Sequence, residues 1–90
     1  MANNKSAIKR WHQSLRRRDR NRARRTLMRS ASRRLREAVV EGDEPAITGA
    51  LSEAYSSLDR AAKAGSIHKR QADRRKRRLA ALVHRSASAT

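Results

Sequence analysis

The densest run of residues that could do chemistry is RRRDRNRARR, residues 16–25, in which Asp19 is the one side chain of opposite charge. Guanidinium groups bind phosphate through paired N–H donors and stack on nucleobases. On a helical wheel these arginines spread over about two-thirds of the circumference. A charge run usually forms a solvated helix face, but such a face normally mixes both signs. The segment therefore predicts a helix held between several anionic strands. Its arginines are Arg16, Arg17, Arg18, Arg20, Arg22, Arg24 and Arg25.

The basic side chains are distributed unevenly along the chain. Residues 1–41 hold 14 Lys or Arg against three acids, a net charge of +11, whereas residues 42–66 have −2 and residues 67–90 have +7. The middle segment is therefore expected to face away from an anionic partner, or to face water. The C-terminal segment adds further candidate phosphate ligands, namely Lys69, Arg70, Arg74, Arg75, Lys76, Arg77 and Arg78.

The overall charge also favours a polyanionic partner. A net charge of +16 on 90 residues, with a pI near 12.0, opposes compaction through self-repulsion unless a polyanion relieves it. A GC-rich genome would enrich arginine over lysine as well, but it would not explain the total charge. Cysteine is absent, which excludes disulfides and thiolate metal sites and is compatible with a reducing compartment.

Other functional classes find no support in the sequence. His12, His68 and His84 stand alone, no pair of carboxylates suggests a catalytic site, and no glycine-rich nucleotide-binding motif occurs. We therefore expect no enzyme, metal, cofactor or small-molecule substrate. No apolar run is long enough to span a membrane, and no signal peptide is recognisable.

Two turn signals divide the chain into helices. Gly42 can end one helix, Asp43 can cap the next, and Gly65 can end that one. The remaining sequence is rich in Ala, Arg, Leu, Glu and Lys, which are good helix formers. We expect an all-α fold, a three-helix bundle in a single domain over residues 1–85. Its predicted helices cover residues 4–41, 44–64 and 67–85, and residues 86–90 are predicted to form a disordered tail.

Apolar residues recur at spacings of three and four in each predicted helix, so that three stripes can close a small bundle. The stripes are Met28, Ala31, Leu35, Ala38 and Val39; Ile47, Leu51, Ala54, Leu58 and Ala61; and Ala72, Leu79, Leu82 and Val83. The first helix would be about 55 Å long and the others about 30 Å. Because short loops make neighbouring helices antiparallel, the second helix should end near the level of residue 20. The first helix is therefore expected to project beyond the bundle.

The projecting half carries its own apolar residues, Ile8, Trp11 and Leu15, which fall almost opposite the bundle-facing stripe on the wheel. An aromatic residue on an apolar face is by default a core residue, but this geometry favours exposure of Trp11. Like charges at spacings of three and four disfavour an isolated helix. We therefore expect residues 4–22 to be largely disordered in the free protein and helical on an anionic partner. His68, in the first turn of the third predicted helix, favours a first-turn or phosphate-contacting role.

Several motifs, in order and at their expected spacing, resemble one known family. They are the opening ANNKSAIKR, the stretch NRARRTLMR at residues 21–29, the Gly42–Asp43 turn, and AGSIHK at residues 64–69 followed by the basic third helix. Together they cover nearly the whole chain. They resemble the bacterial small-subunit ribosomal protein family conventionally numbered twenty.

This resemblance implies a three-helix bundle with an extended first helix, direct binding to 16S rRNA early in assembly of the 30S ribosomal subunit, a cytoplasmic location on the ribosome, and no enzymatic activity. It implies rRNA contacts by Lys5, Lys9, Arg10, the arginines from Arg16 to Arg29, His68, Lys69, Arg74, Lys76 and Arg78; Trp11 and Asn21 complete the candidate set. The alternative is a nucleoid-type, DNA-compacting basic protein. A membrane-active cationic helix fits least, because arginine surrounds the first helix where lipid would require an apolar side.

Overall fold

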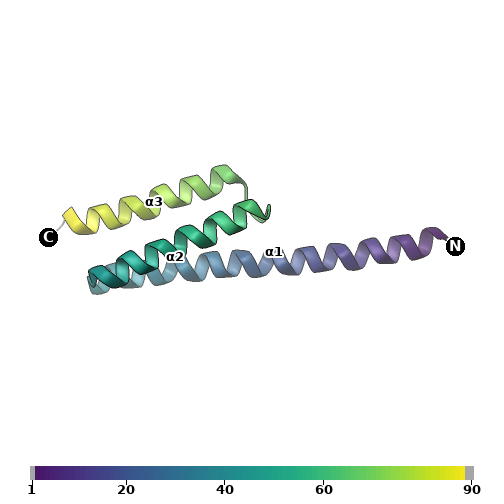
Figure 1. Ribbon diagram of the computed structural model, residues 1–90, viewed down its shortest axis with the longest axis horizontal. Helices are drawn as coiled ribbons and strands as arrows, with labels where there is room; N and C mark the ends of the chain where they lie inside the picture. Colours follow the sequence, from purple (N-terminus) through teal and green to yellow (C-terminus); the bar gives the residue numbers. More distant parts are fainter. Residues whose placement is uncertain (1, 89–90) are drawn as a thin grey trace.

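The computed structural model describes residues 2–88, which form three helices joined by two short turns (Figure 1). The helices are α1 (Ala2–Glu41), α2 (Glu44–Lys63) and α3 (Lys69–Ser88). Helix α2 lies against the C-terminal half of α1, and α3 packs chiefly on α2 (Figure 1). The N-terminal half of α1 projects alone, which gives the molecule extents of 69 × 21 × 13 Å. The predicted all-α fold with a projecting first helix is confirmed.

The first turn reverses the chain at Gly42, whose φ of 76° lies in the left-handed region that favours glycine. Its N–H donates to the Ala38 carbonyl at 3.0 Å, which ends α1 with a single backbone bond. Asp43 occupies the N-cap of α2, and its carbonyl accepts from the Ile47 N–H at 2.9 Å. The Asp43 side chain, however, makes no capping hydrogen bond. The cap predicted at Asp43 is therefore made by the backbone, with Pro45 in the first turn.

The second turn uses glycine in the same way, with a φ of 80° at Gly65. The Ser66 N–H donates to the Ala61 carbonyl at 2.8 Å and the Gly65 N–H to the Ala62 carbonyl at 3.1 Å. This pair of bonds is the Schellman arrangement, which satisfies the last free carbonyls of a helix. Helix α2 ends as a result at Lys63, within one residue of the predicted end.

Helix α3 begins at Lys69 rather than at residue 67, because His68 is the residue that caps it. The His68 carbonyl accepts from the Ala72 N–H at 3.1 Å, and its Nδ1 accepts from the Arg70 N–H at 3.1 Å. Ile67, just before the cap, is buried in the core together with Ala72. This pair forms a hydrophobic staple, which fixes the angle at which the chain enters α3.

The C-terminal end of α3 also differs from the sequence-based expectation. The helix continues through Ser88, three residues past the predicted end at residue 85. No glycine or proline follows residue 85, and alanine in this segment favours continuation of the helix. Of the residues expected to form a disordered tail, 86–88 therefore belong to α3, and 89–90 lie outside the described residues.

The hydrophobic core joins the three predicted stripes. Its largest fully buried side chains are Met28, Leu35 and Leu58, and small residues such as Ala54 and Ala61 let the helices approach closely. The core cluster comprises Met28, Ala31, Leu35, Ala54, Leu58, Ala61, Ile67, Ala72 and Leu79. The partly buried Val39, Ile47, Leu51 and Val83 pack against it. Most positions of the three predicted stripes are thus confirmed, and Ile67 is an addition from the turn. Ala38 is buried outside this cluster, and the half-buried Leu82 lines a groove instead of joining the core.

The projecting half of α1 has no helix packed against it. All side chains from residue 4 to residue 20 are exposed except Leu15, which is half-buried. Ile8 keeps 56% of its surface exposed and Trp11 keeps 59%, as the helical wheel predicts. The α2–α3 turn reaches α1 at Asn21, whose Oδ1 accepts from the Ser66 hydroxyl at 2.9 Å. This contact confirms the expected level at which the bundle ends.

Candidate nucleic-acid interface

The arginine-rich segment spans the point at which α1 leaves the bundle. Arg16, Arg18 and Arg22 are exposed, whereas Arg24 and Arg25, on the bundle side of Asn21, are half-buried. The other two arginines of the segment, Arg17 and Arg20, are exposed as well. Because the helix has no neighbour before residue 21, cationic groups point outward around it. These guanidinium groups can therefore bind phosphates that approach the helix from several sides.

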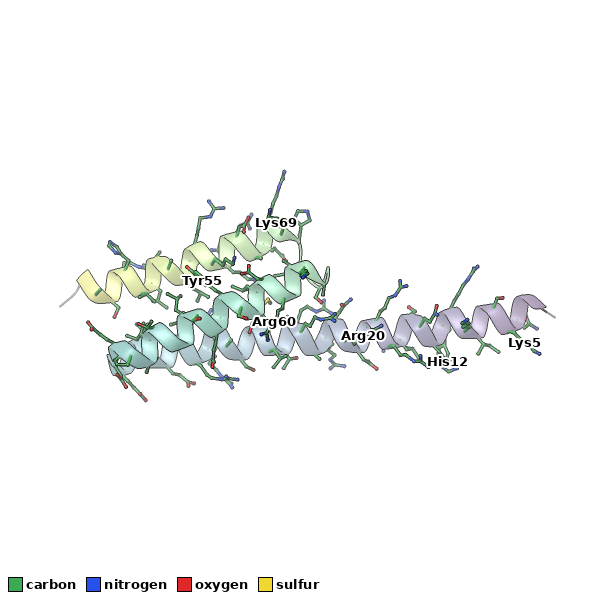
Figure 2. The ribbon with its side chains drawn as sticks, viewed as in Figure 1. Lys5, His12, Arg20, Tyr55, Arg60 and Lys69 are labelled. Carbon is green, nitrogen blue, oxygen red and sulfur yellow. The ribbon has the colours of Figure 1, made fainter. Side chains whose placement is uncertain are left out.

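The α2–α3 turn brings a second set of candidates to the same level of the molecule. The Ser66–Asn21 hydrogen bond ties the turn to α1, and α3 begins three residues after Ser66. His68, Lys69 and Arg70 are all exposed there, and Figure 2 shows Lys69 at the start of α3. The Oδ1 of Asn21 is engaged by this tie and by Arg24 Nη1 at 3.4 Å. Asn21 therefore positions the two basic elements relative to each other.

His68 contributes to this region in two ways. Its Nδ1 accepts the Arg70 N–H, so the neutral ring that makes this cap carries its proton on Nε2. The side chain is exposed, which leaves the Nε2–H donor available to an anionic oxygen. The cap agrees with the expected first-turn role, and a phosphate contact remains compatible with it.

The remaining candidates follow α3 away from the turn. Arg74, Arg77 and Arg78 are exposed, whereas Arg75 and Lys76 are half-buried. The Lys76 ammonium forms an ion pair with the Asp59 carboxylate of α2 and lies 5.6 Å from the centroid of the Tyr55 ring. The hydrogen bond from Lys76 to Asp59 raises the pKa of Lys76 above its usual range.

Acidic side chains of α2 pair with basic side chains on both neighbouring helices. Glu53 accepts from Arg34 of α1 at 3.5 Å, and Asp59 pairs with Lys76 of α3. Helix α2 lies between its two neighbours, so Glu53 and Asp59, both more than half exposed, offset positive charge where the helices meet at the surface (Figure 2). These two pairs involve two of the four acids of the middle segment.

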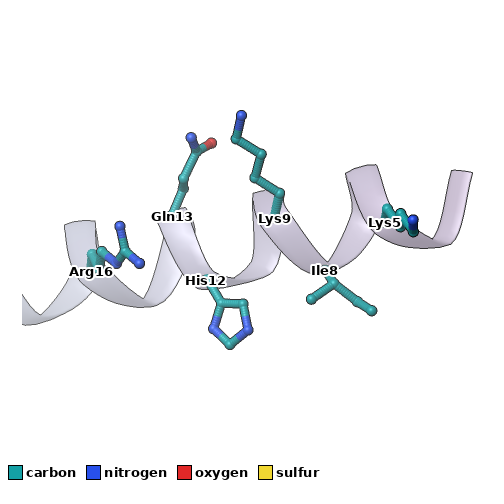
Figure 3. A pocket seen from close by; sticks show the side chains of 6 residues that line it. All are labelled: Lys5, Ile8, Lys9, His12, Gln13 and Arg16. Atoms are coloured by element: carbon teal, nitrogen blue, oxygen red, sulfur yellow. The ribbon is translucent and has the colours of Figure 1, made fainter. Parts of the chain in front are cut away.

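The outer end of α1 carries Lys5, Lys9 and Arg10, all exposed. A shallow hollow lies along this end, and every residue that lines it comes from α1: Lys5, Ile8, Lys9, His12, Gln13 and Arg16. In Figure 3 Lys9 and Gln13 point to one side of the helix, and Ile8 and His12 point to the other. Trp11 contacts the neighbouring His12, with ring centroids 5.0 Å apart.

Sequence reasoning missed a basic group at the opposite end of the molecule. Arg36 of α1 and Arg78 and Arg85 of α3 surround an apolar groove that contains Val40 and Leu82. Arg36 and Arg85 were not among the sequence candidates, and both are exposed. The seven-residue spacing of Arg78 and Arg85, which places both on one helix face, is the signal that could have identified Arg85.

Taken together, the candidates form an extended basic surface along α1 and α3. The outer-end residues lie far from the others, the arginine segment and the start of α3 lie at one level, and Arg29 lies exposed farther along α1. Within residues 2–88, no group of three or more His, Asp or Glu side chains could hold a metal ion. None of the described helices is long and apolar enough to cross a membrane.

The sequence of the chain matches one family of known proteins. The family model described as ribosomal protein S20 matches residues 2–84. The small ribosomal subunit protein bS20 of Kosmotoga olearia is 49% identical over 84 residues, covering 92% of this chain and 86% of that protein. The bS20 protein of Aliivibrio fischeri is 46% identical over 83 residues, covering 92% of this chain and 96% of that protein. The chain belongs to the ribosomal protein S20 family.

Proposed function

We propose that this protein is a structural, non-enzymatic constituent of the 30S ribosomal subunit in the cytoplasm. In this proposal it binds 16S rRNA directly through α1 and α3 and supports early subunit assembly. The observation that carries the proposal is the arginine-rich α1, against which neither of the other described helices packs before Asn21. Family membership and the names of the relatives agree with this role.

The mode of binding follows from the side chains presented. Exposed guanidinium groups lie around α1 rather than on one narrow stripe, which suits contact with several converging RNA strands. Arginine binds phosphate bidentately, and double-stranded RNA is recognised mainly through its shape, phosphates and 2′-hydroxyls. We therefore infer that α1 neutralises phosphates of adjacent RNA helices, with little reading of base sequence.

Within this proposal the three helices have different roles. Helix α2 supplies the core residues Ala54, Leu58 and Ala61 and the acids that pair with Arg34 and Lys76. Helices α1 and α3 supply the cations. The Ser66–Asn21 hydrogen bond holds the start of α3 at the level of the arginine segment, so both can meet the same region of RNA.

Crosslinking in living cells, followed by identification of the attached nucleic acid, tests the proposal. We expect 16S rRNA to be the main partner, and crosslinked peptides to come from α1 and α3 rather than from α2. Co-sedimentation with 30S particles should persist at moderate salt. Recovery mainly with DNA after removal of ribosomes would instead identify a nucleoid-type, DNA-compacting protein.

A further inference from the structure

The apolar strip on the projecting half of α1, formed by Ile8, Trp11 and Leu15, is not needed for the protein core. Trp11 keeps 59% of its surface exposed and Ile8 keeps 56%. The only ring near Trp11 among the described residues is that of His12, inclined at 59° to the indole, so it does not lie flat on the indole face. Residues three and four apart are neighbours on a helix, so Ile8 and Leu15 flank the indole on either side. The strip therefore presents one planar aromatic surface between two aliphatic side chains.

Positive charge borders this strip. Lys5 and Arg16 line the hollow that also includes Ile8 and His12, whereas Lys9 points to the other side of the helix (Figure 3). On the same face as Trp11, seven and eleven residues farther along the helix, lie the exposed Arg18 and Arg22. At 1.5 Å per residue these arginines are about 10 and about 16 Å from Trp11 along the helix axis.

The occupant of the strip must therefore combine an apolar planar group with negative charge. Asp19 is the only acid in residues 1–36, so the region offers almost nothing to a basic partner. A protein that covered the strip would need an apolar contact surrounded by several acidic side chains. A nucleotide meets the requirement within one molecule, because its base is planar and its phosphates are anionic.

We propose that Trp11 stacks on an unpaired RNA base, while neighbouring basic residues of α1 bind the phosphates on either side of it. Inside a regular duplex the base faces are covered by their neighbours, so the base must come from a bulge, loop or strand end. Stacking on an aromatic side chain tolerates any base, since every base has a π-face. The proposal rests on the proposed function and adds one local contact to α1 that depends on unpaired RNA.

The test uses the full-length protein, a fully paired RNA duplex, and the same duplex with one unpaired nucleotide. Trp11 is the only tryptophan, so its fluorescence reports on the strip directly. We expect stronger quenching by the duplex with the unpaired nucleotide. Trp11→Leu, which keeps an apolar side chain but removes the aromatic face, should weaken binding to that RNA by about 5- to 100-fold. It should leave binding to the paired duplex nearly unchanged.

Two further variants control the experiment. Trp11→Phe keeps an aromatic face and should retain most of the preference for the unpaired nucleotide. Leu27→Ala removes an apolar side chain of α1 with nearly the same exposure, 60%, and should bind both RNAs as the wild type does. Circular dichroism of all variants checks that the bundle is intact.

The outcomes separate this proposal from the proposed function. If Trp11→Leu binds both duplexes as tightly as the wild type while the wild type still binds 16S rRNA, stacking is refuted and the proposed function stands. If the wild type does not bind 16S rRNA, the proposed function fails, and the two duplexes still test stacking. Equal quenching of Trp11 by the two duplexes would also overturn the proposal.

Discussion

Replacement of Lys76 by glutamine should destabilise the protein without the loss of an RNA contact. The ammonium of Lys76 pairs with Asp59 and lies over the Tyr55 ring. The Asp59 side chain is 60% exposed, so the ion pair contributes only about 0.2–1 kcal/mol. A cation–π contact at an exposed site adds about 0.5–1 kcal/mol. We therefore expect Lys76→Gln to lower the free energy of unfolding by about 1–2 kcal/mol, which in a small domain decreases Tm on the order of 5–10 °C.

Arg74→Gln is the matched comparison, because Arg74 lies on the same helix and is exposed. It should leave Tm nearly unchanged. If Arg74 contacts one phosphate, its loss should weaken binding to 16S rRNA and make the slope of log K against log salt shallower by about 0.7–0.9. Lys76→Gln should leave this slope as it is.

The assay combines thermal unfolding by circular dichroism with RNA titrations at several salt concentrations. Because the pKa of Lys76 is raised in the folded state, its contribution to stability is complete at neutral pH and is lost only as the pH rises through that raised value. Asp59→Asn removes the ion pair but leaves the cation–π contact with Tyr55, so it should lower Tm by only part of this amount, with no loss of RNA affinity. A Lys76→Gln variant with unchanged Tm and a shallower salt slope would refute the reasoning and return Lys76 to the RNA interface.

Three further predictions concern the fold. Leu58→Ala, at a fully buried position, should lower the free energy of unfolding by about 2–5 kcal/mol, whereas Val40→Ala should change it by less than about 0.5 kcal/mol; urea titrations measure both. Gly65→Ala, at a φ of 80°, should lower the free energy of unfolding by about 1 kcal/mol or more. Gly49→Ala, in the interior of α2 with nothing within 4 Å of the added Cβ, should raise it by about 0.4–1 kcal/mol. Residues 4–22, most of which extend beyond the packed helices, should contribute little helicity to the free protein by circular dichroism and gain it with small-subunit rRNA. Full helicity before RNA is added would contradict this.

Local sequence signals predicted most of the fold because each acts within one helix or turn. Gly42 and Gly65 both adopt the positive φ for which glycine is suited, and the stripes containing Met28, Leu35 and Leu58 are buried. The lengths of the predicted helices were also sufficient to locate the end of the bundle near residue 20, close to the hydrogen bond between Ser66 and Asn21. The projection of α1 followed from counting residues.

The features that could not be predicted depend on how the helices are placed relative to one another. The Lys76–Asp59 pair joins α3 to α2, and no spacing or motif in the sequence identifies Lys76, among the cations around it, as the partner of Asp59. The basic group of Arg36, Arg78 and Arg85 likewise appears only when the ends of α1 and α3 are brought together. The start of α3 was predicted two residues too early, because a histidine cap lacks the sequence signal that serine, threonine or aspartate would give.

The central claim is that α1 and α3 bind 16S rRNA through many phosphates while α2 supports them, and the salt dependence of affinity tests it most directly. If about eight phosphates are neutralised, the slope of log K against log salt should be about −6 to −7. Arg18→Glu, on the projecting half of α1, should weaken binding strongly and make the slope shallower, whereas Arg60→Glu, exposed on α2, should have a much smaller effect. A slope near about −2, or equal losses for the two substitutions, would contradict the account.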